Sequence, residues 1–415
     1  MNYEFPIIRN ISDVLPAIEG RDEFVVADKG SYTVINYNVM MADTFGKAEH
    51  HTWKKASRPP EDWKDYFTLD DDAKIRRECR GIIFNTETGD IIRRPFHKFF
   101  NVNEREETQD HVIDLSRPHA ILEKLDGSML APFIVNGQMI WGTKMGATDV
   151  AKPVEEFVKN NPQYERFATS CIANGVTPIF EWCSRKQRIV LDYKEDQLIL
   201  TALRDMHTGE YIKLFGDGRI NRLHVEDWDI PVVRAFEPQN DMKAFLEYVR
   251  DLEDLEGFVV RFDDGHMLKL KSQWYLQIHR AKEAILQDRN IVEIILDEKL
   301  DDIKAHLPAE DRDRLTRFEN DFNKVIRPLA LSIVVQVSNC QRIGGMDRKT
   351  FAINYAPKMD AFSRPIAFAM WDDAQYVDVV DICESKVRNT IRNNLGRTVK
   401  YEAIRDAWFP GLCFN

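Results

Sequence analysis

The sequence predicts an α+β protein in which antiparallel sheets with flanking helices occupy residues 1–283 and an all-α domain occupies residues 284–415. Short apolar runs joined by turn residues fill the first part, as is typical of strands in hairpins. Beyond residue 271 the pattern changes to the long apolar and charged periodicity of helices, and only four of the 19 glycines (344, 345, 396 and 411) lie there. A chain of 415 residues is long enough for two domains with separate cores.

Three stretches of the first part predict strand pairs. Residues 81–96, "GIIFNTETGDIIRRPF", are typical of strand, turn and strand. Residues 131–144 carry Asn136-Gly137 between apolar runs, a strong hairpin signal because both turn positions need positive φ. Residues 257–271, "GFVVRFDDGHMLKLK", repeat this design, and alternation in the second arm places Lys269 and Lys271 on one face.

Helical periodicity interrupts and then replaces the strands. We expect helices over residues 153–173 and 241–253 within the first domain. Longer periodic segments follow, among them "IVEIILDEKLDDIKAHL" and "DRDRLTRFENDFNKVIRPLALSIVVQV". These segments predict a helical second domain.

Composition and charge narrow the class of protein. Hydrophobic residues make up 44% and charged residues 30%, the proportions of a soluble globular protein. No apolar run approaches the roughly 18–20 residues of a membrane span, and the N-terminus does not resemble a signal peptide. The six cysteines form no CxxC pair, so we expect a protein of the reducing cytoplasm without disulfides or zinc.

The charge is segregated along the chain. A formal net charge of −11 argues against a protein that coats nucleic acid non-specifically, because such binding depends on Lys and Arg contacts to phosphates. A net negative charge is still compatible with an enzyme that holds nucleic acid in a local basic groove. Basic residues gather in a few stretches, which are 91–100, 184–190, 268–282 and 384–400.

A candidate nucleophile lies in "EKLDGS", residues 123–128, where Lys124 precedes Asp126 and Gly127. The pattern Lys-x-Asp-Gly is weak alone, since short motifs arise by chance. Three later features strengthen it. Glu181 lies within the apolar strand "IFEWCS", where a carboxylate needs a partner. Glu256 begins the strand "EGFVV". The pair Lys269 and Lys271 follows it along the chain.

In this order the residues resemble the motifs of the covalent nucleotidyltransferases, which comprise ATP-dependent DNA ligases, RNA ligases and mRNA capping enzymes. Further blocks resemble RNA ligase 1 of the T-even bacteriophage type and extend the similarity from about residue 30 to about residue 360. These blocks are "ECRGIIF", "RPFHKFFNVNE", "RIVLDY", "LRDMHTGEY", "KSQWYLQIH" and "DRKTFA". The resemblance implies a nucleotidyltransferase (ATP-grasp-like) fold for the first domain.

The resemblance also implies roles for individual residues. Lys124 would carry AMP, and Glu256, Lys269 and Lys271 would act with it in catalysis. A lysine must lose its proton to attack, and burial and the neighbouring cations both disfavour its charged form. The nucleotide-binding set would be Arg80, Lys98, Glu123, Lys124, Lys144, Glu181, Val259, Lys269 and Lys271, and the metal ligands would be Glu181 and Glu256.

Some roles stay open between two interpretations. Val259 would either wall the adenine pocket or only pack within the sheet. Phe100 would either contact the nucleotide or belong to the core, and Ser128 would either touch phosphate or cap the turn. Asp126 and Gly127 are expected to shape the turn that aims Lys124, with Gly127 allowing the backbone to approach the nucleotide.

The expected activity is ATP-dependent RNA ligation in RNA repair. Lys124 would form lysyl-AMP, AMP would pass to an RNA 5′-phosphate, and a 3′-hydroxyl would then seal the strand. The cofactors would be ATP and Mg²⁺, with Mn²⁺ as an alternative, because Mg²⁺ prefers carboxylates and substrate phosphates. The expected partner is RNA, including tRNA broken in the anticodon loop, bound by a monomer that carries a substrate-selecting helical domain. The alternatives are DNA ligation or RNA capping, and a non-catalytic protein that binds RNA ends.

Overall fold

The computed structural model describes residues 3–53, 64–216, 218–220, 223–373 and 377–414. The chain divides into two compact units, Met1–Leu276 and Gln277–Asn415. The division falls within α6 (Gln273–Ala284), a few residues before the boundary at 283 that the sequence suggests. Among the helices that the structure describes, none combines the length and apolar character that a bilayer span requires.

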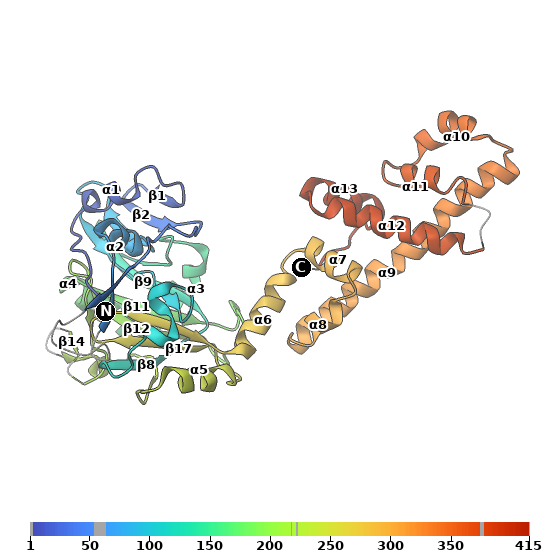
Figure 1. Cartoon of the computed structure of the whole chain (residues 1–415). Coiled ribbons are helices and arrows are strands. Elements are labelled where there is room, and N and C mark those ends of the chain that lie inside the picture. The colour runs from blue at the N-terminus through green and yellow to red at the C-terminus, as the bar shows by residue number, and fades with distance from the viewer. Residues whose placement is uncertain (1–2, 54–63, 217, 221–222, 374–376, 415) are drawn as a thin grey trace. The chain divides into compact units, whose positions relative to one another are not determined.

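The first unit is built on three larger sheets and is drawn from blue to yellow in Figure 1. A four-stranded sheet has the order β1 (Phe24–Asp28), β2 (Tyr32–Tyr37), β5 (Ile82–Asn85) and β6 (Ile91–Arg93). A five-stranded sheet has the order β10 (Gln138–Gly142), β9 (Ser128–Val135), β11 (Val176–Cys183), β12 (Gln197–Asp205) and β13 (Tyr211–Ile212). A second five-stranded sheet has the order β16 (Ala235–Phe236), β8 (His119–Glu123), β17 (Gly257–Phe262), β18 (Met267–Lys271) and β7 (Phe100–Asn101).

Two short hairpins and several helices complete this unit. The hairpins are β3 (Glu49–Trp53) with β4 (Lys64–Thr68), and β14 (Arg219–Ile220) with β15 (Leu223–His224). The helices are α1 (Leu15–Ile18), α2 (Asp71–Glu78), α3 (Lys152–Asn160), α4 (Gln163–Ala173) and α5 (Met242–Arg250). Phe167 of α4 packs with Phe180 of β11, and Phe245 of α5 packs with Phe258 of β17, so these helices cover the two five-stranded sheets.

The predicted strand pairs and helical stretches are confirmed. Asn136 and Gly137 join β9 to β10 with φ of 50° and 73°, as the hairpin signal requires. The helical stretch expected over residues 153–173 consists of two helices, because Pro162 has no backbone N–H to continue the first and instead precedes the second. The helix expected over residues 241–253 is α5, which is somewhat shorter.

The second unit is all-helical, as predicted, and is drawn in yellow to red in Figure 1. Its longest helix is α9 (Ala309–Ser338), and its core gathers the buried faces of α9 and α12, among them Phe322, Ile326 and Val387. The other helices are α7 (Asp288–Leu296), α8 (Leu300–Lys304), α10 (Arg348–Asn354), α11 (Ser363–Ala369), α12 (Val379–Leu395) and α13 (Thr398–Trp408).

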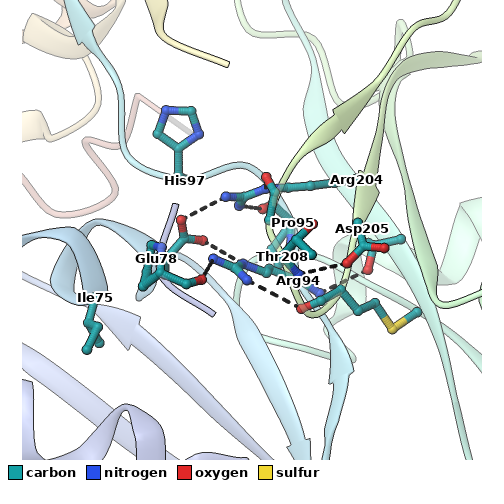
Figure 2. A network of polar contacts seen from close by, with 12 residues as sticks. Ile75, Glu78, Arg94, Pro95, His97, Arg204, Asp205 and Thr208 are labelled. Carbon is teal, nitrogen blue, oxygen red and sulfur yellow. Dashed lines mark hydrogen bonds and ion pairs between the residues drawn. The ribbon is translucent and has the colours of Figure 1, made fainter. Parts of the chain in front are cut away.

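A buried ionic cluster ties α2 to the sheets of the first unit (Figure 2). Glu78 ends α2, and its carboxylate accepts hydrogen bonds from Arg94 Nε at 3.0 Å and from Arg204 Nη2 at 2.7 Å. The guanidinium groups also donate to backbone carbonyls, including those of Pro95 and His207. Burial alone would raise the pKa of Glu78, but the two arginines hold it below its usual value. The cluster therefore fixes the end of α2, just before Arg80.

Candidate active site

Lys124 lies in the short turn that joins the two five-stranded sheets. The turn runs from the end of β8 at Glu123 to the start of β9 at Ser128, and these strands belong to different sheets. The Lys124 backbone N–H donates to the carbonyl of Gly257 on β17 at 2.9 Å. The lysine is therefore held at the junction of the two sheets.

Glu256 lies between two of the predicted catalytic lysines. Its Oε1 accepts from Lys124 Nζ at 2.7 Å and from Lys271 Nζ at 3.0 Å, and its side chain is only 3% exposed. Gly257, the next residue, has φ of +145°, and a Cβ there would lie 1.9 Å from the Leu270 carbonyl oxygen. Only glycine fits this position, so the backbone that places Glu256 depends on it.

Asp126 fixes the rest of the turn. It is 3% exposed, and its Oδ2 accepts from the backbone N–H groups of Val190 and Leu191, both at 2.7 Å. Its Oδ1 accepts from the hydroxyl of Tyr275 on α6, also at 2.7 Å. The carboxylate thus connects the turn to the "RIVLDY" segment and to the "KSQWY" segment.

Glu181 of β11 faces the same turn. Its Oε1 accepts from the Gly127 N–H at 3.2 Å. A Cβ at Gly127 would lie 2.3 Å from the carbonyl oxygen of Trp182, so the close neighbour that requires glycine here is β11. Burial raises the pKa of Glu181 to about 7; Lys124 opposes the rise and Glu256 adds to it.

Lys269 has an aromatic neighbour and no carboxylate partner within the described residues. Its Nζ lies 4.6 Å from the centroid of the Phe99 ring. Desolvation, followed by the charges of Arg80, Lys98 and Lys124, lowers its pKa well below the usual value. An anionic group placed beside Lys269 would relieve this repulsion.

These side chains surround a cavity of about 330 Å³ in the first unit. Seven of the predicted nucleotide-binding or catalytic residues line it, and these are Arg80, Glu123, Lys124, Glu181, Val259, Lys269 and Lys271. Apolar lining comes from Phe96, Phe99, Leu122, Val233 and Met267, among others. The cavity has a group of cations near the Lys124 turn, and farther along β17 Arg261 lies among apolar walls.

Three predicted residues do not line this cavity. Glu256 is buried behind Lys124 and Lys271, as described above. Lys98 and Lys144 each place Nζ 5.5 Å from the centroid of the Tyr37 ring. Burial, with Arg80 and Arg105 nearby, lowers the pKa of Lys98 although Glu104 opposes this.

Some residues that line the cavity or support it were not predicted from the sequence. Phe100 is 2% exposed and belongs to the core, whereas its neighbour Phe99 lines the cavity. The extended residues 99–101 point alternately to opposite sides, which was a usable signal. The same alternation on β17 places Arg261 on the cavity side with Val259. Nothing local in the sequence indicates that Asp126 binds Tyr275.

The two predicted metal ligands, Glu181 and Glu256, differ in whether a carboxylate oxygen is available to a divalent cation. Glu181 uses Oε1 for Gly127, and no hydrogen bond engages Oε2 within the described part of the chain, so this oxygen is available as a hard ligand. Glu256 is occupied by two lysines. The described residues contain no group of three or more metal-ligating side chains. The site therefore suits a cation that takes most of its ligands from water and substrate phosphates.

Arg80, Lys124, Lys269 and Lys271 meet in this cavity with the carboxylates of Glu123 and Glu181. Residues 78–275 match the family model described as RNA ligase. The matched segment contains Arg80, Lys124, Glu181, Glu256 and the rest of the cavity lining.

Individual relatives agree with this family. A putative RNA ligase of Thermovibrio ammonificans is 32% identical over 242 residues, which cover 56% of this chain and 62% of the relative. RNA ligase 1 of bacteriophage TS2126 is 27% identical over 250 residues, which cover 57% of this chain and 59% of the relative. The chain thus spans about three-fifths of the length of these curated relatives.

A solved archaeal ATP-dependent RNA ligase aligns with 91% of this chain and 78% of its own, at 13% identity and a TM-score of 0.38. This alignment is too loose to establish a common arrangement of the elements.

Proposed function

We propose that the chain is an ATP-dependent RNA ligase that joins 5′-phosphate and 3′-hydroxyl ends through a lysyl-AMP intermediate. The observation that carries the proposal is the position of Lys124, which lines a cavity together with Lys269, Lys271 and Arg80. A triphosphate is the kind of ligand that this set of cations suits. The match of residues 78–275 to the RNA ligase family model supports RNA as the substrate class.

In the first step the Lys124 amine attacks the α-phosphorus of ATP. A phosphorus–nitrogen bond forms, the bond from the α-phosphorus to the bridging oxygen breaks, and pyrophosphate leaves. Lys124 must lose a proton before it attacks, and Glu256 Oε1, 2.7 Å from Nζ, is placed to accept it. Lys269 and Lys271 would neutralise charge on the phosphate oxygens as the transition state forms.

The remaining steps use the same cavity. An oxygen of the RNA 5′-phosphate attacks the α-phosphorus and displaces Lys124, which gives a 5′–5′ pyrophosphate linkage. A 3′-hydroxyl then attacks the RNA phosphorus and displaces AMP. The contribution of the protein is mainly positioning and charge neutralisation, as in other phosphoryl transfers.

The other cavity residues have binding roles in this proposal. Glu181 would contact the ribose or a divalent cation, Val259 and Glu123 would border the base, and Arg80 would contact phosphates. Lys98 and Lys144, which share the Tyr37 ring, would receive the outer phosphates or the RNA 5′-phosphate. Bound Mg²⁺ would supply neutralisation of the phosphate charges beside Glu181.

The test is transfer of label from α-³²P-ATP to the denatured protein in the presence of Mg²⁺, followed by sealing of a 5′-phosphorylated RNA. We expect labelled wild-type protein, no label on Lys124→Ala, and little label on Glu256→Gln. An unlabelled wild-type protein would contradict the covalent mechanism, and labelled Lys124→Ala would contradict the assigned nucleophile. The same assay with GTP and with DNA ends separates RNA ligation from capping and DNA ligation.

A non-catalytic protein that binds RNA ends is the second candidate. It predicts binding of 5′-phosphorylated RNA without labelling. The presence of Lys124, Glu181 and Glu256 in one site argues against it, because end binding alone does not need a lysine held by a buried carboxylate.

We further propose that the helical unit selects the RNA, with broken tRNA as the natural substrate. The basic stretch of residues 384–400 motivated this idea, but several of its cations have acidic partners. Lys386 pairs with Asp373, Arg388 with Glu384, and Arg392 with Asp297. Arg397 and Lys400 are exposed and form no ion pair within the described residues, so they are the cations available for phosphates.

A further inference from the structure

Arg261 differs from the other buried arginines of the first unit. It is only 8% exposed, and its Nη1 is a buried nitrogen without a hydrogen-bond partner. Across the described part of the chain, its guanidinium donates no hydrogen bond and forms no ion pair. Burying a guanidinium N–H and its charge without an acceptor destabilises a fold, so the position needs an explanation.

Arg93 shows how this fold satisfies a buried arginine. It is fully buried, and its guanidinium donates five hydrogen bonds to the backbone carbonyls of Gly81, Ala131, Gly142 and Thr143. Arg94 and Arg204 are likewise satisfied by Glu78 and by carbonyl groups. The unsatisfied guanidinium of Arg261 is therefore not a general feature of the arginines in this core.

Arg261 also lines the cavity that holds Lys124. Val259 and Arg261 point to the cavity side of β17, whereas Phe258, Val260 and Phe262 point into the core on the other side. The register pairs Gly257 with Lys271, Val259 with Lys269, and Arg261 with Met267. Arg261 thus lies four residues, or about 13 Å, along the strand from the level of the Lys124 turn.

The surroundings of Arg261 suit a flat heteroaromatic ring. Phe96, Val233 and Met267 also line the cavity and are apolar. Thr201 lines it too, and its hydroxyl donates to the Ile179 carbonyl at 2.9 Å, so its oxygen remains an acceptor. The cavity thus has cations at one end, and apolar walls with the Arg261 guanidinium at the other. An extended nucleotide needs these two environments for its phosphates and for its base.

We propose that Arg261 is the specificity residue for the base: its guanidinium donates a hydrogen bond to N1 of adenine when ATP occupies the cavity. This rests on the proposed ATP-dependent function and adds to it the group that recognises the base. Because guanidinium has donors and no acceptors, it favours a base that presents an acceptor nitrogen. Adenine N1 is an acceptor, whereas the same position of guanine carries a hydrogen.

The proposal explains why an unsatisfied arginine is kept. Desolvation lowers the pKa of Arg261 in the free protein, which reflects the same unfavourable burial. Binding of adenine supplies the missing acceptor, so the interaction strengthens nucleotide binding at the expense of the stability of the free protein. A purely structural arginine would instead stabilise the free protein and would not strengthen nucleotide binding.

The test pairs a variant of the protein with variants of the nucleotide. Labelling of Lys124 is measured with ATP and with 1-deaza-, 3-deaza- and 7-deaza-ATP, each of which replaces one acceptor nitrogen by CH. In wild type we expect 1-deaza-ATP, and not the other two analogues, to raise KM ten- to a hundredfold, the range of a hydrogen bond from a charged group. In Arg261→Met that penalty should disappear, and in Arg261→Lys it should remain in part. If each deaza analogue raised KM by the same factor in wild type and in Arg261→Met, the proposal would be overturned.

A stability measurement separates base recognition from a structural role. We expect Arg261→Met to unfold at the same or a higher temperature than wild type without nucleotide, and to gain less stability from added ATP. Arg93→Met, the matched control, should unfold at a much lower temperature because four carbonyls lose their donors. If Arg261→Met were destabilised like Arg93→Met and kept the full ATP effect, Arg261 would be structural. Wild-type protein that takes no label from any nucleotide would instead contradict the proposed function.

Discussion

At the scale of single residues, Glu181 gives the site a pH dependence near neutrality. Its pKa is raised to about 7, so the carboxyl changes from mostly protonated to mostly ionised between about pH 6 and pH 8. A divalent cation competes with the proton for this carboxylate. We predict that the affinity of the nucleotide-free protein for Mn²⁺, measured by electron paramagnetic resonance, rises over this range. In Glu181→Gln the affinity should be low and independent of pH.

The same group affects folding stability with a defined sign. Because the folded state raises the pKa of Glu181 above the usual 4.5, the folded protein binds more protons between about pH 4.5 and pH 7. The contribution of Glu181 to the free energy of unfolding is thus full below pH 4.5 and is lost as the pH rises through 7. Glu181→Gln should remove this part of the pH dependence, and an unchanged pH profile would show that Glu181 is not the titrating group.

Lys269 gives a second prediction at this scale. Its lowered pKa leaves part of the population neutral at alkaline pH, and a bound phosphate would restore the charged form. ATP binding should therefore take up a proton in the window between the lowered pKa and the usual value of 10.5. Calorimetry in two buffers of different ionisation enthalpy measures this uptake. It should vanish in Lys269→Met and persist in Lys186→Met, which removes an exposed lysine outside the cavity.

At the scale of elements, the Glu78 cluster connects α2 with β12 and with the segment that follows β6. Removing the carboxylate charge leaves Arg94 and Arg204 buried without a counter-ion, so we predict that Glu78→Gln lowers the free energy of unfolding by about 3–5 kcal/mol. Urea unfolding of the full chain measures this loss. Asp381→Asn, which breaks an exposed ion pair with Arg327, should leave the urea midpoint unchanged.

The pH dependence of this cluster has the opposite sign to that of Glu181. The arginines lower the pKa of Glu78, so its stabilising contribution is present above about pH 4.5 and is lost as the pH falls through the lowered pKa. A wild-type protein that loses no more stability in acid than Glu78→Gln would contradict the role of the cluster.

The Asp126 contacts couple the Lys124 turn to α6 and to the Val190 segment. We predict that Asp126→Ala abolishes most labelling of Lys124 and destabilises the protein by about 1–3 kcal/mol for each donor that stays buried without an acceptor. Asp126→Asn is the matched control, because its amide oxygen can accept from both N–H groups while its NH₂ donates to the Tyr275 hydroxyl oxygen. Equal losses in the two variants would show that charge, rather than the bonding pattern, matters.

At these two scales the sequence predicted the strands, the hairpin turns and most of the cavity lining. The strands and turns could be predicted because apolar alternation and turn residues are local features of the sequence. The cavity lining could be predicted because the motifs follow one another in a recognisable order. It failed where the outcome depends on packing. The contact from Asp126 to Tyr275 joins residues that lie far apart in the sequence, and no local pattern indicates it.

At the scale of the whole molecule, the sequence predicted a helical second unit but overstated its free positive charge. A count of cations in residues 384–400 does not show which of them pair with acids from other helices. We predict that the double variant Arg397→Glu and Lys400→Glu in the full chain slows sealing of broken tRNA more than sealing of plain single strands. Arg392→Glu with Lys386→Glu, which alters paired cations, should have the smaller effect on this preference. Equal effects of the two double variants would contradict the proposed role of Arg397 and Lys400.

The turn that carries Lys124 has a consequence for how such a protein can evolve or be redesigned. Lys124–Gly127 are the only residues between β8 and β9, and those strands are fixed in separate sheets. An insertion or deletion here would shift the register of a strand, because side chains alternate every residue along it. The length of this connection is therefore constrained, and variation in the chemistry of the site must come from exchanging side chains around a lysine whose backbone is held by Gly257.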